Sequence, residues 1–167
     1  MHDTKIAGTT QRNDLCMALP DELRQILLSN EKTVTAPNGA QLLTQGKFVQ
    51  HLILLKSGSV QISLACPGRE MSWTLDRPGQ IFGMRAIISG QVSEIDVTCV
   101  RQCEVGLFER DFFLAMLKAY PEIYFAVSRI LSFDLKIANR ILFDRRQEIG
   151  AKAIAKKSLQ HSNLLIF

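Results

Sequence analysis

The 167-residue chain is long enough for one globular domain and an appended helix, and its 47% hydrophobic and 22% charged residues are ordinary for a folded protein. Its apolar runs are too short to span a bilayer, and its polar start lacks the apolar stretch of a signal peptide. This composition argues against a membrane protein and favours a cytoplasmic location. The formal net charge is +4. Basic residues cluster after Lys136; we interpret them as a solvated helix face, with contact to nucleic acid or an acidic partner as the alternative.

The first part of the chain predicts a disordered tail over residues 1–14 and a short helix over residues 19–28. Pro20 suits the first turn of that helix, because its missing N–H group has no partner there in any case. Asp21 and Glu22 follow at once, and acidic side chains favour a helix N-terminus. The apolar residues of this segment share one face, which is expected to pack on the rest of the domain.

The middle of the chain, residues 32–107, consists of short runs rich in Val, Ile, Leu and Thr that are separated by Gly-containing turns. Residues 60–64 and 71–75 alternate between apolar and polar side chains, which predicts two half-buried strands joined by a turn. Short strands with regular Gly turns are typical of a β-sandwich or a barrel-like roll. The predicted fold class is therefore mainly β with flanking helices (α+β).

After Phe108 the apolar period becomes helical, with a short helix over residues 110–117 and a long one that begins at Pro121. The long helix carries an apolar stripe larger than one small domain is expected to cover, which predicts a homodimer. The alternative is that the stripe packs entirely on its own roll. The residues expected in the dimer seam are Val127, Ile130, Ile137 and Ile141.

These elements divide the chain into four predicted parts. A tail (1–14) precedes a β-roll domain (15–120), a long dimerisation helix (121–157) and a second tail (158–167). The residues after Lys152 provide at most one helix of a helix-turn-helix, so we expect no complete DNA-binding motif in this chain.

Residues that carry catalytic or metal chemistry are sparse. The four cysteines, Cys16, Cys66, Cys99 and Cys103, lack the close pairs that zinc or iron–sulfur sites use. Cys99 and Cys103 lie in an apolar run and predict buried thiols, with a redox or metal role as the alternative. There is no Ser/His/Asp set, metalloprotease motif or P-loop, so the sequence predicts neither an enzyme nor a metal site.

The segment from Arg77 to Ser93 is the most informative one. It contains Pro78-Gly79, Phe82-Gly83 and Ser89-Gly90-Gln91. Together with the earlier turn glycines and the order of the elements, this segment resembles the phosphate-binding cassette of the cyclic-nucleotide-binding domain family. More narrowly, residues 19–146 resemble the sensor half of bacterial transcription regulators of the catabolite activator and fumarate–nitrate type. The resemblance implies a double-stranded β-helix jelly roll followed by a long dimerisation helix.

The resemblance also shows which ligand contacts differ. In the family, a Glu directly after the cassette glycine binds the ribose, and an Arg further on pairs with the cyclic phosphate through its planar guanidinium. Here those positions hold Met84 and Ser93, and Glu94 follows where a small residue is usual. Two hydroxyl residues of the long helix that contact the purine correspond to Ala138 and Asn139. Arg85 is a candidate to replace the missing positive charge.

The resemblance implies a set of candidate ligand-binding residues, namely Phe82, Gly83, Met84, Arg85, Gln91, Ser93, Glu94, Ala138 and Asn139. The altered contacts predict a regulatory sensor domain with a degenerate cassette that does not bind cyclic AMP in the usual way. A less charged small-molecule effector and an empty pocket filled by side chains remain open. The alternatives are a true cyclic-nucleotide-binding domain, for cyclic AMP or cyclic GMP, and a ligand-free dimerisation or interaction module.

Overall fold

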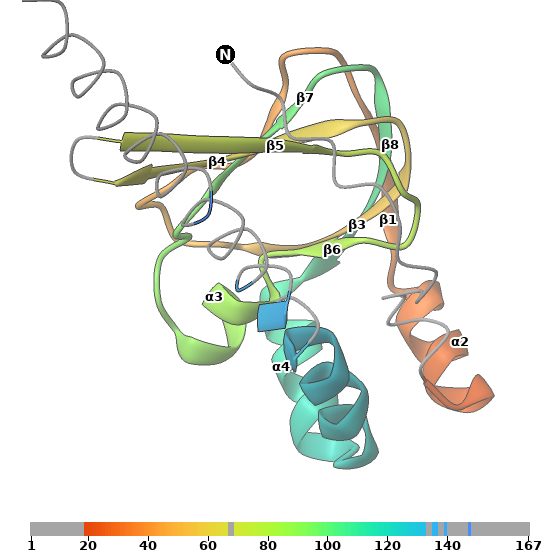
Figure 1. The fold of residues 1–167 in the computed structure, drawn as a ribbon. Helices are drawn as coiled ribbons and strands as arrows, with labels where there is room; N and C mark the ends of the chain where they lie inside the picture. The colour runs from red at the N-terminus through yellow and green to blue at the C-terminus, as the bar shows by residue number, and fades with distance from the viewer. Residues whose placement is uncertain (1–18, 67–68, 133–134, 137–138, 140–146, 148–167) are drawn as a thin grey trace, which may run out of the picture. The chain divides into compact units, whose positions relative to one another are not determined.

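Two four-stranded antiparallel sheets face each other in the computed structural model, which describes residues 19–66, 69–132, 135–136, 139 and 147 (Figure 1). The chain divides into two units, Met1–Ile130 and Leu131–Phe167. Both sheets belong to the first unit, and the jelly roll expected from the sequence is confirmed. The predicted tails, 1–14 and 158–167, lie outside the described residues.

The first sheet has its two long strands in the centre. Its order is β1 (Lys32–Ala36), β8 (Cys103–Glu109), β3 (His51–Ser57) and β6 (Ile81–Phe82). Four consecutive residues of β3, Leu52 to Leu55, are buried, as expected for a strand covered on both faces. The short strand β6 pairs with β3 and leads directly into the cassette helix.

The second sheet ends in the hairpin that the alternating sequence predicts. Its order is β2 (Gln41–Leu43), β7 (Asp96–Cys99), β4 (Val60–Cys66) and β5 (Arg69–Leu75). Strands β4 and β5 pair continuously from Val60 opposite Leu75 to Cys66 opposite Arg69, which confirms the predicted hairpin. Strand β7 continues this sheet and follows the cassette in the chain.

Helices lie at the edge of the roll. They are α2 (Asp21–Ser29), α3 (Met84–Ser89) and α4 (Arg110–Ala119), and residues 122–132 are also helical. The predicted helices over 19–28 and 110–117 are therefore present, with Pro20 at the N-cap of α2. Helices α3 and α4 contact each other and β3, on the same side of the first sheet (Figure 1). No helix in the described part of the chain is long and apolar enough to cross a membrane.

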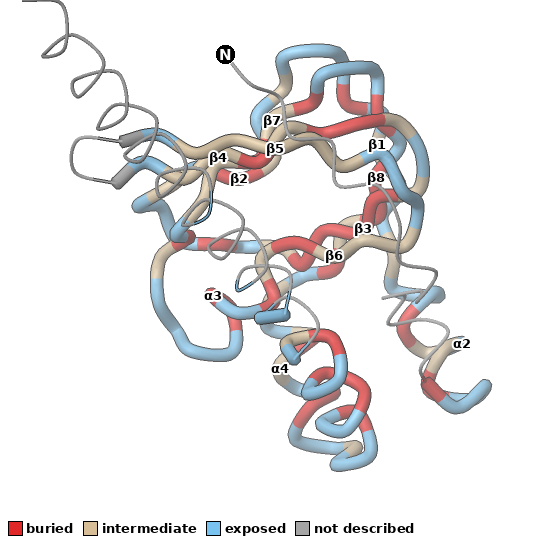
Figure 2. The backbone as a smooth tube through the Cα atoms, in the orientation of Figure 1, coloured by how far each residue is buried: buried red, intermediate tan, exposed pale blue. Residues whose placement is uncertain are grey.

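The core lies between the two sheets and under α3 and α4, where buried backbone follows β3, β6 and the helices (Figure 2). Its largest fully buried side chains come from helices and strands alike, namely Phe108, Phe113, Leu27, Leu52, Leu55, Ile87 and Ile123. Because Ile87 belongs to α3, the cassette helix is part of the core of the roll.

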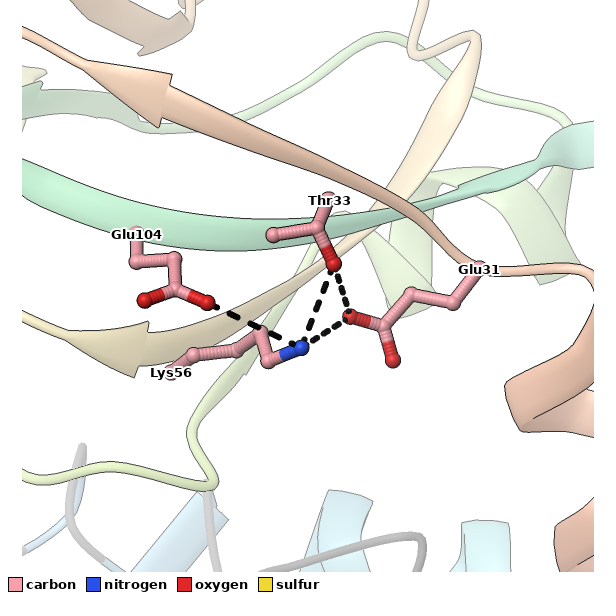
Figure 3. A network of polar contacts seen from close by, with 4 residues as sticks. All are labelled: Glu31, Thr33, Lys56 and Glu104. Carbon is pink, nitrogen blue, oxygen red and sulfur yellow. Dashed lines mark hydrogen bonds and ion pairs between the residues drawn. The ribbon is translucent and has the colours of Figure 1, made fainter.

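The outer face of the first sheet carries a polar cluster on strands β1, β3 and β8 and on the residue just before β1 (Figure 3). The side chain of Glu31 is only 7% exposed, and its Oε1 atom lies 2.7 Å from Nζ of Lys56. The Thr33 hydroxyl donates a hydrogen bond of 3.0 Å to the same oxygen, and Glu104 approaches Lys56 at 3.9 Å. A β-carbon at Gly106 would lie 2.6 Å from Glu31 Oε1, so the cluster depends on a glycine at this position.

The helix over residues 122–132 presents two different faces. One face is buried within the chain and contains two residues that the sequence placed in the dimer seam; its members are Ile123, Ala126, Val127 and Ile130. Apolar side chains are also exposed here, with Phe125 at 74% and Tyr124 at 49%, and Leu135 further on is 61% exposed. The other predicted seam residues, Ile137 and Ile141, lie outside the described residues.

Candidate functional site

The cassette begins at Gly83, which is the N-cap of α3 and has a φ of 87°. This left-handed conformation is strained for residues with a side chain. A β-carbon at this position would also lie 2.8 Å from Cγ1 of Val49 and 3.2 Å from the carbonyl oxygen of His51. Gly83 thus combines a special backbone angle with close packing, and its carbonyl accepts the N–H of Ile87 at 3.0 Å to start the helix.

The other end of the short helix is fixed by Gly90, which is also left-handed. The N–H of Gln91 donates to the carbonyl of Ala86 at 3.1 Å and closes the helix at its C-terminus. The Gln91 side chain is exposed. The backbone frame suggested by the glycine pattern is therefore present, with a short helix held between two turn glycines.

Met84, the first position at which the sequence differs from the resembled family pattern, is buried. Its residue exposure is 3%, and the preceding Phe82 is 5% exposed. A carboxylate buried here would need a charged or hydrogen-bonded partner. A methionine needs none and adapts to irregular apolar surroundings. The position that resembles the family's ribose-binding Glu thus contributes apolar packing in this chain.

The second altered position, Ser93, is 4% exposed and its polar groups are fully engaged. Its hydroxyl donates a hydrogen bond of 2.7 Å to the carbonyl of Ile95. Its N–H donates to the carbonyl of Lys47, and its carbonyl accepts from the N–H of Gly46, each at 2.8 Å. Ser93 therefore holds the segment in place through local contacts and carries no charge toward a ligand.

Arg85 and Glu94 directly follow these two buried positions in the sequence, and they form an ion pair with each other. The pair joins Nη2 of Arg85, on α3, to Oε1 of Glu94, in the segment that leads to β7. Both side chains are about three-fifths exposed, at 62% and 61%. The positive charge considered as a replacement for the family Arg is thus opposed by a carboxylate of the same chain.

The last two predicted ligand residues belong to the second unit of the chain. Asn139 is an exposed helical residue, and Ala138 lies outside the described residues. Their expected role in contacting a ligand stays a prediction.

The loop after β2 supports the cassette in a way that the sequence did not reveal. The Gln45 side chain accepts from the N–H of Ala65 at 3.0 Å and donates to its carbonyl at 3.1 Å. The Asp96 carboxylate accepts from the Gln45 N–H at 2.9 Å and from the Gln41 amide at 2.7 Å. These bonds fix the loop that holds Ser93. Gly46 is the only signal of this loop in the sequence, because the partners are 20 to 55 residues apart.

The thiols of Cys99 and Cys103 are buried, as the sequence predicts, and both are free. Burial, together with a hydrogen bond and charge interaction with Cys103, raises the pKa of Cys99 to about 12. The Cys103 thiol also contacts the carbonyl oxygen of Ser59 at 3.3 Å. Within the described residues, no group of three or more His, Cys, Asp and Glu side chains is arranged to hold a metal ion.

The facing sheets and the glycine-bounded helix α3 define a jelly-roll domain with a retained cassette frame. A family model described as "Cyclic nucleotide-binding domain" matches residues 33–120. The chain therefore belongs to the cyclic nucleotide-binding domain family. A search of curated proteins finds no match.

Solved structures share this fold. The Thermus thermophilus catabolite activator protein is 25% identical, with a TM-score of 0.66 over 77% of this chain and 61% of its own. The sensor domain of the transcriptional regulator DNR from Pseudomonas aeruginosa is 22% identical, with a TM-score of 0.59 over 72% of this chain and 82% of its own.

A eukaryotic structure has the same fold at lower coverage. The regulatory domain of Toxoplasma gondii PKA with cAMP is 22% identical, with a TM-score of 0.56 over 62% of this chain and 40% of its own. The chain thus spans less than two thirds of the length of this protein and of the Thermus protein.

Proposed function

We propose that this chain is the regulatory, non-catalytic sensor domain of a bacterial signalling protein or transcription regulator, with a cytoplasmic location. We further propose that its cassette does not bind cyclic AMP in the usual way. One observation carries the second proposal: Met84 is buried without a charge, and the hydroxyl of buried Ser93 is bonded to Ile95. The likeness to a catabolite activator and to a regulator's sensor domain supports the first.

The energetic argument concerns the missing Arg at position 93. Removing one partner of a buried, hydrogen-bonded charge pair costs about 2–5 kcal/mol, and each ~1.4 kcal/mol is a tenfold change in affinity. A micromolar cyclic-nucleotide site that loses this contact would bind with a Kd of roughly 0.03–4 mM. The absence of a carboxylate at Met84 removes a second contact, so weak binding at best is expected.

The remaining interior favours an effector with little charge. Met84 and Ile87 are buried on α3, so the side chains that the cassette helix turns toward its neighbours are apolar. An apolar or weakly polar small molecule fits such a surface better than an anionic nucleotide. The alternative is a domain without an effector, in which these side chains fill the site themselves. The test below distinguishes these two outcomes.

The test is a titration of the purified chain with cyclic AMP, monitored by thermal unfolding and calorimetry. The unmodified protein is expected to show no saturable stabilisation at tens of micromolar ligand. The double variant Met84→Glu/Ser93→Arg restores both family contacts on the retained frame and is expected to bind, whereas each single variant should bind more weakly. A saturable shift of several degrees in the unmodified protein would contradict the proposal. A screen of apolar and neutral compounds then separates an altered site from an empty one.

We also propose a homodimer through the helical region that begins at residue 122. Val127 and Ile130 are buried within the single chain, so at these positions the stripe packs inside the protomer. The exposed side chains of Phe125 and Tyr124 are available to a second copy instead. The proposed seam therefore uses the exposed apolar side chains, with the buried ones supporting the helix from within.

A further inference from the structure

We infer that Glu94 is a built-in counter-ion that occupies Arg85 and thereby disfavours anionic ligands at the cassette. This inference rests on the proposed function, because it concerns how the same cassette selects among ligands. It starts from the ion pair between Nη2 of Arg85 and Oε1 of Glu94.

The position of the pair links it to the two ligand positions. Arg85 directly follows Met84 on α3, and Glu94 directly follows Ser93 in the segment that leads to β7. Met84 and Ser93 are buried, whereas both partners of the pair are mostly exposed. The ion pair therefore joins α3 to the segment that leads to β7, on the solvent side of the cassette.

The charges of this pair act on an incoming anion in two ways. A phosphate or carboxylate group that approaches Arg85 must first displace the Glu94 carboxylate, which already balances the guanidinium charge. The same carboxylate repels the anion directly. Arg85 would otherwise be well suited to anions, since its planar group makes two parallel hydrogen bonds to phosphate oxygens.

The size of the effect follows from the exposure of the pair. Ion pairs between exposed side chains are weak, and solvent and salt screen them. Releasing Arg85 and removing one repulsive charge is therefore expected to tighten binding of an anionic ligand by about two- to tenfold. The ion pair of Arg85 and Glu94 therefore adjusts a weak affinity for anionic ligands. Breaking it does not replace the missing contacts at positions 84 and 93.

The experiment measures binding of cyclic AMP at millimolar concentrations by NMR titration of the full chain at low salt. Glu94→Gln removes the charge and keeps the shape of the side chain, and it is expected to bind cyclic AMP two- to tenfold more tightly than the unmodified protein. Asp21→Asn is the matched control, because it makes the same change in net charge at an exposed carboxylate that pairs with Arg24 on α2. This control is expected to bind like the unmodified protein.

The double variant Arg85→Ala/Glu94→Gln tests whether Arg85 is the group that Glu94→Gln releases to bind the anion. The gain seen in Glu94→Gln should vanish when Arg85 is absent, and it should shrink as salt is added. Equal affinities for Glu94→Gln and the unmodified protein, or a gain that persists without Arg85, would overturn the inference. Tight binding by the unmodified protein would instead refute the proposed function, and the comparison among variants would still decide the role of Glu94.

Discussion

The buried thiol of Cys99 shows how the surroundings of a residue in this roll can make it unreactive. Its burial, and then its hydrogen bond with Cys103, favour the protonated form and raise its pKa. A thiol must ionise to act as a nucleophile or a soft metal ligand. The raised pKa therefore agrees with a packing role for this residue, which the apolar surroundings in the sequence had predicted.

The reactivity of Cys99 gives a prediction at the same scale. A thiol whose pKa is about 12 rather than 9.0 is ionised about a thousandfold less at pH 8. A Cys16→Ser/Cys66→Ser/Cys103→Ser background removes the contribution of Cys103 but keeps burial, which is the largest cause of the shift, so Cys99 should still react with Ellman's reagent far more slowly in the native protein than in denaturant. Fast native labelling would show that the thiol is accessible and ionised.

The pH dependence of stability has a definite sign for this group. The folded-state pKa of Cys99 lies above its ordinary value, so the neutral thiol stabilises the fold at neutral pH. This contribution is fully present below about pH 9 and is lost as the pH rises toward about 12. Comparing the protein with its Cys99→Ala variant across this range isolates the contribution of the thiol.

Sequence reasoning reached some residues of the site and missed others for a physical reason. The identities of Met84 and Ser93 already implied that these two positions carry no charge, and both proved to be buried. The pairing of Arg85 with Glu94 was not predicted, because it depends on how α3 is oriented relative to the segment that leads to β7. A single sequence records the charges at these positions but not whether they meet in the fold.

Among the elements, strands in which apolar and polar side chains alternate were the easiest to predict. The hairpin of β4 and β5 follows from the polar and apolar pattern of its own residues. The loop that carries Gln45 could not be predicted, since its bonds to Ala65 and Asp96 join distant parts of the chain. Its role in holding Ser93 therefore becomes evident only in three dimensions.

Strand β8 provides a prediction at the scale of elements, through the contact between Gly106 and Glu31. Gly106→Ala is expected to lower the free energy of unfolding by about 1–3 kcal/mol, because its methyl group displaces the Glu31 carboxylate from Lys56. In a Glu31→Ala background the same substitution should cost much less. Urea unfolding at a fixed protein concentration measures both values.

A control distinguishes this contact from a general intolerance of side chains in β8. An Asp21→Ala background removes an exposed carboxylate on α2, and the cost of Gly106→Ala should be unchanged there. If the substitution costs the same in all three backgrounds, Glu31 is not the group that excludes a side chain at this position.

At the scale of the whole molecule, the proposed homodimer can be tested by substitution of an exposed apolar residue. Phe125→Asp places a charge on an exposed apolar residue and is expected to shift a dimer toward monomer. Arg101→Gln makes the same change in net charge at an exposed position outside this helix and should leave the dimer intact. Sedimentation velocity of the three proteins checks this result.

The same experiment tests the homodimer directly. An unmodified protein that sediments as a monomer would refute the seam. Ile130→Asp is a poor probe for this purpose, because Ile130 is buried within the chain and its substitution would destabilise the protomer itself.

The main-chain hydrogen bonds of Ser93 bear on how ligand preference evolves in this fold. The segment is held to Lys47 and Gly46 by backbone groups, which every residue except proline can supply. These two backbone bonds therefore remain available when the side chain at position 93 is changed, although the hydroxyl bond to Ile95 is lost. Because the backbone support of position 93 does not depend on its side chain, the roll is a starting point for engineered biosensors.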